Sequence, residues 1–123
     1  MAANPASHAP ELKLETEKTS SETTVRATGR IILETSAKLE STLRDLMPEG
    51  KRIVLDLTSV DYIDSAGLGA LVSVCMHARR TDCALEIANP KQRLRDLFNR
   101  SGLGPLFESG PFDKLWQAWS RSD

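Results

Sequence analysis

The stretch of sequence that decides the fold is "RIVLDLTSVDYIDSAGLGALVSV", which runs from Arg52 to Val74. Its first six residues are a β-branched, apolar run of the kind that forms a central strand buried on both faces. "TSVDYID" then leads into a glycine-containing apolar segment that favours a helix from about Ser65 to Arg80. We therefore expect a strand, a connection and a helix, with a serine at the start of the helix.

The sequence before this stretch predicts two strands and a helix. Leu12 and Leu14 alternate with charged residues, which is typical of a half-buried edge strand. "TTVRATG", which ends at Gly29, predicts the second strand of a hairpin, and "RIIL" can extend it. Thr35 or Ser36 can then cap a helix. The apolar residues of this helix recur at helical spacing at Leu39, Leu43, Leu46 and Met47.

The sequence after this stretch predicts a further alternation of strand and helix. "CALEIAN", residues 83–89, is the next expected strand, and a helix follows Pro90 and closes at Gly102. "PLFES" is compatible with a last short strand, and Pro111 starts a final amphipathic helix. The helix after Pro90 carries its apolar side on Leu94, Leu97 and Phe98.

Strands at the beginning, followed by alternating helices and strands, indicate an α/β fold. We expect a mixed β-sheet of four to five strands with about four α-helices packed mainly on one face. The length of 123 residues fits one domain. We place it at residues 11–120, after a disordered leader at 1–10 that is rich in Ala, Pro, Asn and Ser, and before a tail at 121–123.

Composition narrows the classes of function. Sixteen basic and seventeen acidic residues give a net charge of −1, so no electrostatic case exists for direct nucleic acid binding or attraction to a membrane. No apolar segment is long enough for membrane insertion, and the N-terminus lacks the features of a secretory signal, so we expect a cytoplasmic protein. We expect free thiols at Cys75 and Cys83, because they do not have the spacing of a CxxC motif. We expect no metal site, because His8 and His77 are far apart in the sequence.

Ser65 has two simple interpretations besides a regulatory one. Either Ser65 or Asp64 can cap the helix, because each side chain can accept from the free amides of the first turn. A nucleophile requires a base, and the helix offers only His77, roughly 18 Å away at a rise of about 1.5 Å per residue. That separation is beyond hydrogen-bond reach, so we expect no catalytic residue and no enzymatic activity.

The third interpretation is a phosphorylation switch. A phosphate on Ser65 would add about −1.5 to −2 charges beside Asp64 and would repel a partner that accepts the bare hydroxyl. The presence of Gly67 and Gly69 in this helix needs an explanation, because a glycine inside a helix reduces stability by roughly 1 kcal/mol relative to alanine. One reason is close approach by another protein, the other is close packing against the sheet, and each reason can apply to one glycine.

The sequence resembles the STAS domain family, and in particular the bacterial anti-sigma factor antagonists. The resemblance rests on "RIVLDLTSVDYIDSAGLGALVSV", with its "DSAGLG" core, and on "ALEIANPKQRLRDLFNRSGL", and it extends over roughly Glu11 to Trp119. It implies a STAS-like α/β fold, no catalytic activity and no cofactor of the chain's own. By the same resemblance, Ser65 would match the position that an anti-sigma factor with serine kinase activity phosphorylates.

The resemblance also implies a mechanism and a set of partners. The unphosphorylated protein would bind the anti-sigma factor/serine kinase, which brings the ATP, and would release a sigma factor for transcription; a serine phosphatase would reverse the switch. The implied contact residues are Asp64, Ser65, Ala66, Gly67 and Leu68, together with Arg30 and Ile31.

One departure from the family pattern favours a different class of function. Many members carry an aspartate soon after the glycine equivalent to Gly29, and here Ile32 stands in about that place, with Glu34 two positions on. STAS domains also occur as docking subunits of lipid or anion transport complexes. In that class the same surface would bind an ATPase or permease, and Ser65 would be a contact or a cap.

Overall fold

The computed structural model describes residues 11–103, which form a four-stranded mixed sheet with three α-helices. The strands lie in the order β1 (Leu12–Lys18), β2 (Glu22–Ile31), β3 (Arg52–Ile63) and β4 (Leu85–Ala88). β1 runs antiparallel to β2, whereas β2, β3 and β4 run parallel to one another. The prediction of an α/β fold with a mixed sheet is confirmed.

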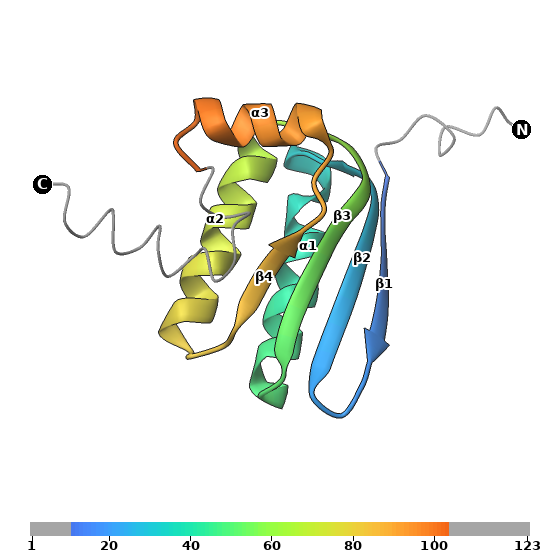
Figure 1. Cartoon of the computed structure of the whole chain (residues 1–123), viewed down its shortest axis with the longest axis vertical. Coiled ribbons are helices and arrows are strands. Elements are labelled where there is room, and N and C mark those ends of the chain that lie inside the picture. Colours follow the sequence, from blue (N-terminus) through green and yellow to red (C-terminus); the bar gives the residue numbers. More distant parts are fainter. Residues whose placement is uncertain (1–10, 104–123) are drawn as a thin grey trace, which may run out of the picture.

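The helices cover one face of the sheet. α1 (Leu33–Leu46) and α2 (Ser65–Arg80) lie side by side behind it, and α3 (Gln92–Arg100) crosses the upper end of α2 (Figure 1). A short 3₁₀ turn, η2 (Met47–Glu49), follows α1. Among the described residues, none of the helices combines the length and apolarity that crossing a membrane would require.

The core fills the space between the sheet and the two long helices. Val25 and Ala27 of β2 and alternate residues of β3 point inward, as expected for a sheet that is covered on one face. The outer face of the sheet carries polar residues, such as Glu15 and Arg26. We expected β3 to be buried on both faces, whereas only its inner face is covered. The fully buried residues of β3 are Ile53, Leu55, Leu57 and Val60.

β3 is twice as long as expected and brings its last residue directly to α2. The segment after Leu57, which we interpreted as a connection, continues as strand to Ile63. Its pairing with β2 shifts register twice, between Arg26 and Thr28 and between Gly29 and Arg30. Such bulges interrupt the alternation of inward and outward residues. This interruption explains why the pattern of the sequence resembled a loop there.

The other predicted boundaries are close to the observed ones. α1 begins two residues before Thr35, so neither Thr35 nor Ser36 is its cap, whereas α2 has the expected bounds. α3 presents Leu94 and Phe98 to the core, with Leu97 partly buried against it. The expected strand at "PLFES" and the expected helix from Pro111 lie outside the described residues.

The parallel strands bring three connections to one end of the molecule. β2, β3 and β4 all end at the upper edge of the sheet, where each leads into a helix (Figure 1). The starts of α1, α2 and α3 therefore lie at the same end, although they are separated by up to about sixty residues of sequence. This end carries Ser65.

Candidate functional site

Ser65 is exposed at the first position of α2. A single residue, Asp64, separates it from the end of β3. The hydroxyl of Ser65 forms no hydrogen bond with any of residues 11–103, and this leaves it available to a partner molecule. Because Ser65 caps nothing, the structure assigns the capping role to its neighbour.

Asp64 is the N-cap of α2 and also contacts the start of α1. Its Oδ1 accepts a hydrogen bond of 2.7 Å from the backbone N–H of Gly67. Its Oδ2 accepts one of 3.1 Å from the backbone N–H of Leu33, the first residue of α1. The backbone N–H of Asp64 donates to the carbonyl of Ile31 at 3.3 Å. Asp64 therefore joins two helix starts and the end of β2.

The start of α1 lacks a capping side chain of its own. Ile32 occupies the N-cap position with an extended backbone and an apolar, buried side chain. Thr35 partly compensates, because its Oγ1 accepts from the N–H of Ile32 at 2.9 Å and donates to the carbonyl of Arg30 at 2.7 Å. The amide of Leu33 is left to Asp64.

The two glycines of α2 face different surroundings. A Cβ on Gly67 would lie 1.9 Å from the carbonyl oxygen of Ile31, so this glycine is required for close packing of α2 against the end of β2. A Cβ on Gly69 would meet nothing within 4 Å. Of the two reasons expected for these glycines, close packing applies to Gly67, and the surface is open at Gly69. Close approach of another protein at Gly69 stays a prediction.

The structure changes the set of expected contact residues. Ser65 and Arg30 are exposed, and Asp64, Ala66 and Leu68 are partly buried. The side chain of Ile31 is fully buried in the core, and Gly67 packs against the end of β2. Neither residue is therefore accessible on the surface of the described chain. The structure therefore places these two expected contact residues below the surface, because the close crossing of α2 over the end of β2 covers both.

Two apolar side chains at this end were missed by the sequence analysis. Leu33 and Tyr62 are the exposed large hydrophobic residues of the described chain, at 68% and 48% exposure. Leu33 is tied to Asp64 through its amide, and Tyr62 lies two residues before Asp64 and pairs with Arg30 in the sheet. The sequence carried no signal for them, because their exposure depends on the bulged end of β3 and on the true start of α1.

The geometry offers Ser65 no catalytic partner in the described part of the chain. His77 lies twelve residues further along the same helix, three turns from Ser65. Residues 11–103 also contain no group of three potential metal ligands. The connection expected between the strand and this helix is reduced to Asp64, and the separation of Ser65 from His77 agrees with the distance expected from the sequence.

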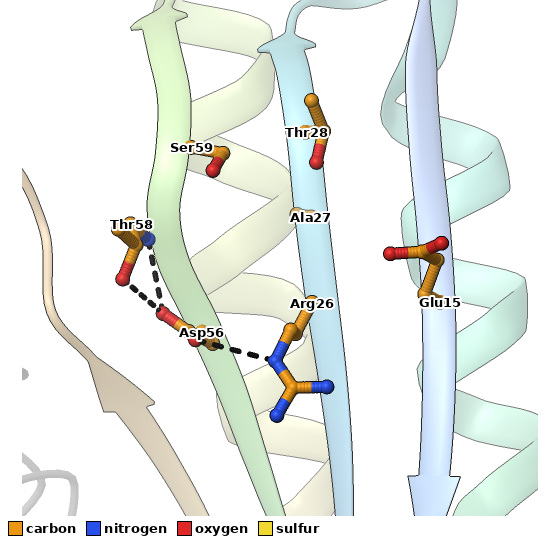
Figure 2. Close-up of a pocket in the computed structure, with 7 residues that line it drawn as sticks. All are labelled: Glu15, Arg26, Ala27, Thr28, Asp56, Thr58 and Ser59. Atoms are coloured by element: carbon orange, nitrogen blue, oxygen red, sulfur yellow. Dashed lines mark hydrogen bonds and ion pairs between the residues drawn. The ribbon is translucent and has the colours of Figure 1, made fainter.

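A shallow hollow of about 270 Å³ lies on the outer face of the sheet, away from the helices (Figure 2). Asp56 on β3 dominates it: Oδ1 accepts from the backbone and hydroxyl of Thr58 and from Asn89, and Oδ2 lies 3.9 Å from Arg26. Burial raises the pKa of Asp56, but these hydrogen bonds and the charge of Arg26 outweigh it and lower the pKa below its usual value. Three hydrogen bonds on Oδ1 tie this carboxylate to Thr58, within the bulged part of β3, and to Asn89, so we assign it a structural role.

Curated proteins similar to this chain share one described role. BtrV of Bordetella bronchiseptica, which is named as an anti-sigma factor antagonist, is 35% identical over 71 residues, or 57% of this chain. The match covers 61% of BtrV's own length. The anti-sigma-B factor antagonist of Staphylococcus aureus is 32% identical over 83 residues, which cover 67% of this chain and 77% of that protein.

Solved structures with the same fold include proteins of two kinds. The anti-sigma factor antagonist SpoIIAA in its unphosphorylated form gives a TM-score of 0.65 at 17% identity, over 92% of this chain and all of SpoIIAA. A sulfate transporter family protein from Wolinella succinogenes gives 0.62 at 20% identity, over 71% of each chain. At such identities the likeness establishes the fold and not the function.

The family is established by a match along most of the sequence. The model of the STAS domain matches residues 13–118, which include all of the described sheet and helices except the first residue of β1. The curated relatives, the solved structures and the arrangement of the "DSAGLG" segment at the start of α2 agree with this match. The chain belongs to the STAS domain family.

Proposed function

We propose that this chain is an anti-sigma factor antagonist that works by binding and has no catalytic activity. Its partner is an anti-sigma factor with serine kinase activity, and phosphorylation of Ser65 ends the binding. Through this switch the chain regulates transcription that depends on a sigma factor. The proposal is supported by the relatives named as anti-sigma factor antagonists.

The observation that carries the proposal is the surroundings of Ser65. An unbonded, exposed hydroxyl lies at a helix start, next to Asp64, which binds the amide of the exposed Leu33. Tyr62, the other exposed large apolar residue of the described chain, precedes Ser65 by three positions. Exposed apolar and aromatic side chains are typical of the core of a protein interface, which is more apolar than the rest of the surface. The hydroxyl is therefore accessible to a kinase and lies where a docked partner would cover it.

The switch follows from the charge that phosphorylation adds. The γ-phosphoryl group of ATP bound by the partner would be transferred to Oγ of Ser65: a P–O bond to serine forms, the bond to the β,γ-bridging oxygen breaks, and the hydroxyl proton is released with ADP. The product carries about −1.5 to −2 charges next to Asp64. A partner surface that covered the hydroxyl would then bury an unpaired charge, which is strongly unfavourable. Hydrolysis by a serine phosphatase restores the bare hydroxyl.

A second function deserves a test because of Ile32. The apolar residue at the cap of α1 departs from the acidic residue that we expect in many family members, and the same fold occurs in a sulfate transporter family protein. The alternative is a docking subunit of a lipid or anion transport complex. In that function Ser65 would be an interface residue without modification.

The experiment uses the full chain as bait in lysate of its native host. Wild type, Ser65→Asp and Ser65→Ala are compared, and bound proteins are identified by mass spectrometry. We expect wild type and Ser65→Ala to retain an ATP-binding kinase that Ser65→Asp loses. The recovered kinase, once purified and given ATP and Mg²⁺, should phosphorylate wild type at Ser65 and leave Ser65→Ala unmodified. A transport ATPase or permease retained by all three baits would refute the proposal in favour of the alternative.

A matched pair of variants tests the docking surface itself. Gly69→Glu places a charge in open space near Ser65 without meeting another atom within 4 Å, so it should abolish kinase binding in a folded protein. Arg80→Glu, at the other end of α2, should bind as wild type does. Equal binding by both variants would exclude the start of α2 from the interface.

A further inference from the structure

The carboxylate of Asp64 is shared between two helices. One oxygen receives the amide of Gly67 in α2, at 2.7 Å, and the other receives the amide of Leu33 in α1, at 3.1 Å. These two residues are separated by 34 positions in the sequence and belong to neighbouring helices. A displacement of this one side chain would therefore remove a hydrogen bond from both helix starts at once.

The start of α1 depends on this shared carboxylate. A helix N-terminus leaves four amides without intrahelical partners. In α1 the cap is Ile32, which offers no side-chain acceptor, and the nearby hydroxyl of Thr35 is already engaged with the backbone of Ile32 and Arg30. The amide of Leu33 thus relies on a residue of another helix. Leu33 itself is 68% exposed and is the most exposed large apolar residue of the described chain.

A phosphate on Ser65 would compete directly with the carboxylate of Asp64. The two groups would be on adjacent residues, so their negative charges would repel each other. Both would also seek the same amides at the start of α2, which favour an anion. The phosphate carries the larger charge and three acceptor oxygens.

We propose that Asp64 is a positioning residue that couples Ser65 to α1: phosphorylation of Ser65 displaces the Asp64 carboxylate, frees the amide of Leu33, and loosens the first turn of α1. This inference rests on the proposed phosphorylation of Ser65. It adds a second effect to charge repulsion, because the exposed side chain of Leu33 then loses its fixed place beside the serine. One modification alters both halves of the contact surface.

The test needs the full chain and no partner. Phosphoserine is incorporated at position 65 by genetic encoding, and the exchange of backbone amides with water is measured by NMR. We expect the exchange rate of the Leu33 amide to rise on the order of tenfold to a hundredfold, since a hydrogen bond to a charged group is lost. The amide of Gly67 should stay protected, because the phosphate replaces the carboxylate there.

Two controls isolate the coupling. Phosphoserine at Ser41, which is exposed on the second half of α1, adds the same charge to the same helix and should leave the Leu33 amide unchanged. Asp64→Asn keeps one carbonyl oxygen, which can serve only one of the two helices. Its Leu33 amide should exchange rapidly even without phosphate, and phosphoserine at position 65 should then add little.

A Leu33 amide that is as protected with phosphoserine at position 65 as without it would overturn the inference. So would a Ser41 phosphoserine that has the same effect as that at Ser65. Either result would leave the proposed function standing, because binding and release of the kinase are measured separately. Failure of the kinase to phosphorylate Ser65 would instead refute the proposed function while the encoded phosphoserine still tests the coupling.

Discussion

At the scale of single residues, Gly67 and Gly69 show how one helix satisfies two requirements. Residues two positions apart on an α-helix are rotated by about 200° around its axis, so Gly67 and Gly69 face nearly opposite sides. Gly67 lies against the carbonyl of Ile31, and this contact allows α2 to start directly beside the end of β2. Gly69 faces open space beside Ser65.

Alanine substitutions should therefore have opposite effects at the two positions. Gly67→Ala forces its Cβ against a backbone oxygen and should reduce the free energy of unfolding by about 2–3 kcal/mol, in the range typical of overpacking. Gly69→Ala should increase it by up to about 1 kcal/mol, because alanine favours the helix and clashes with nothing. Urea denaturation of both variants measures the difference. Similar changes in the two midpoints would contradict the described packing of α2.

At the scale of elements, β3 is the most consequential departure from sequence-based expectation. The β-branched, apolar run in "RIVLDL" allowed the first half of this strand to be predicted, and the helical spacing of Leu39, Leu43 and Leu46 allowed α1 to be predicted. The second half contains bulges, and bulges break the periodicity on which such a prediction depends. For the same reason the exposure of Tyr62 was not predicted, because this residue lies in the irregular second half of β3.

The candidate site was predictable to a different extent at each residue. Ser65 and the capping by Asp64 follow from residue types at a helix start, which is local information. The bond from Leu33 to Asp64 joins residues 31 positions apart and depends on the register of β2 with β3. Burial of Ile31 depends on the crossing of α2, so no local pattern could reveal it.

Asp56 makes the bulge of β3 sensitive to acid. Its pKa is below the ordinary 3.8 in the folded protein, so the stability it contributes is present above that value and is lost as the pH falls through the folded pKa. The free energy of unfolding should therefore decrease from about pH 5 to pH 3. Asp56→Asn should show a shallower decrease and a lower stability at pH 7, by about 1 kcal/mol. Denaturant titrations at several pH values measure both.

Asp61→Asn is the matched control for this effect. Hydrogen bonding to Lys91 and the charges of Lys91 and Arg93 lower the pKa of Asp61, but this carboxylate is exposed. Salt screens exposed pairs strongly. In 0.5 M salt the acid sensitivity due to Asp61 should vanish while that due to Asp56 persists; loss of both would show that Asp56 acts only through its charge.

At the scale of the whole molecule, positive charge gathers at the end that carries Ser65. Lys91, Arg93, Arg95 and Arg100 lie on or beside α3 with a single carboxylate, Asp96, among them. α3 crosses the end of α2 that begins with Ser65 (Figure 1). Arg95 and Arg100 form no ion pair with another described residue, so their charge is directed to solvent.

This distribution predicts that the proposed partner approaches with an acidic surface. Arg95→Glu should slow association with the anti-sigma factor several-fold and flatten its dependence on ionic strength, with a smaller effect on dissociation, because exposed charges act mainly on encounter. Arg80→Glu makes the same charge change at the distant end of α2 and should associate normally. Stopped-flow kinetics at two salt concentrations compare them, and equal slowing would point to net charge alone.

The hairpin turn at residues 19–21 is exposed and lies at the opposite end of the sheet from Ser65 (Figure 1). It is held by its own short bonds, from the hydroxyl of Thr19 to the backbone of Glu22 and back. A loop of this kind tolerates inserted sequence. The proposed binding surface and this turn thus lie at opposite ends of the molecule. A reporter grafted between Ser20 and Ser21 can therefore follow the switch in living cells without altering the surface around Ser65.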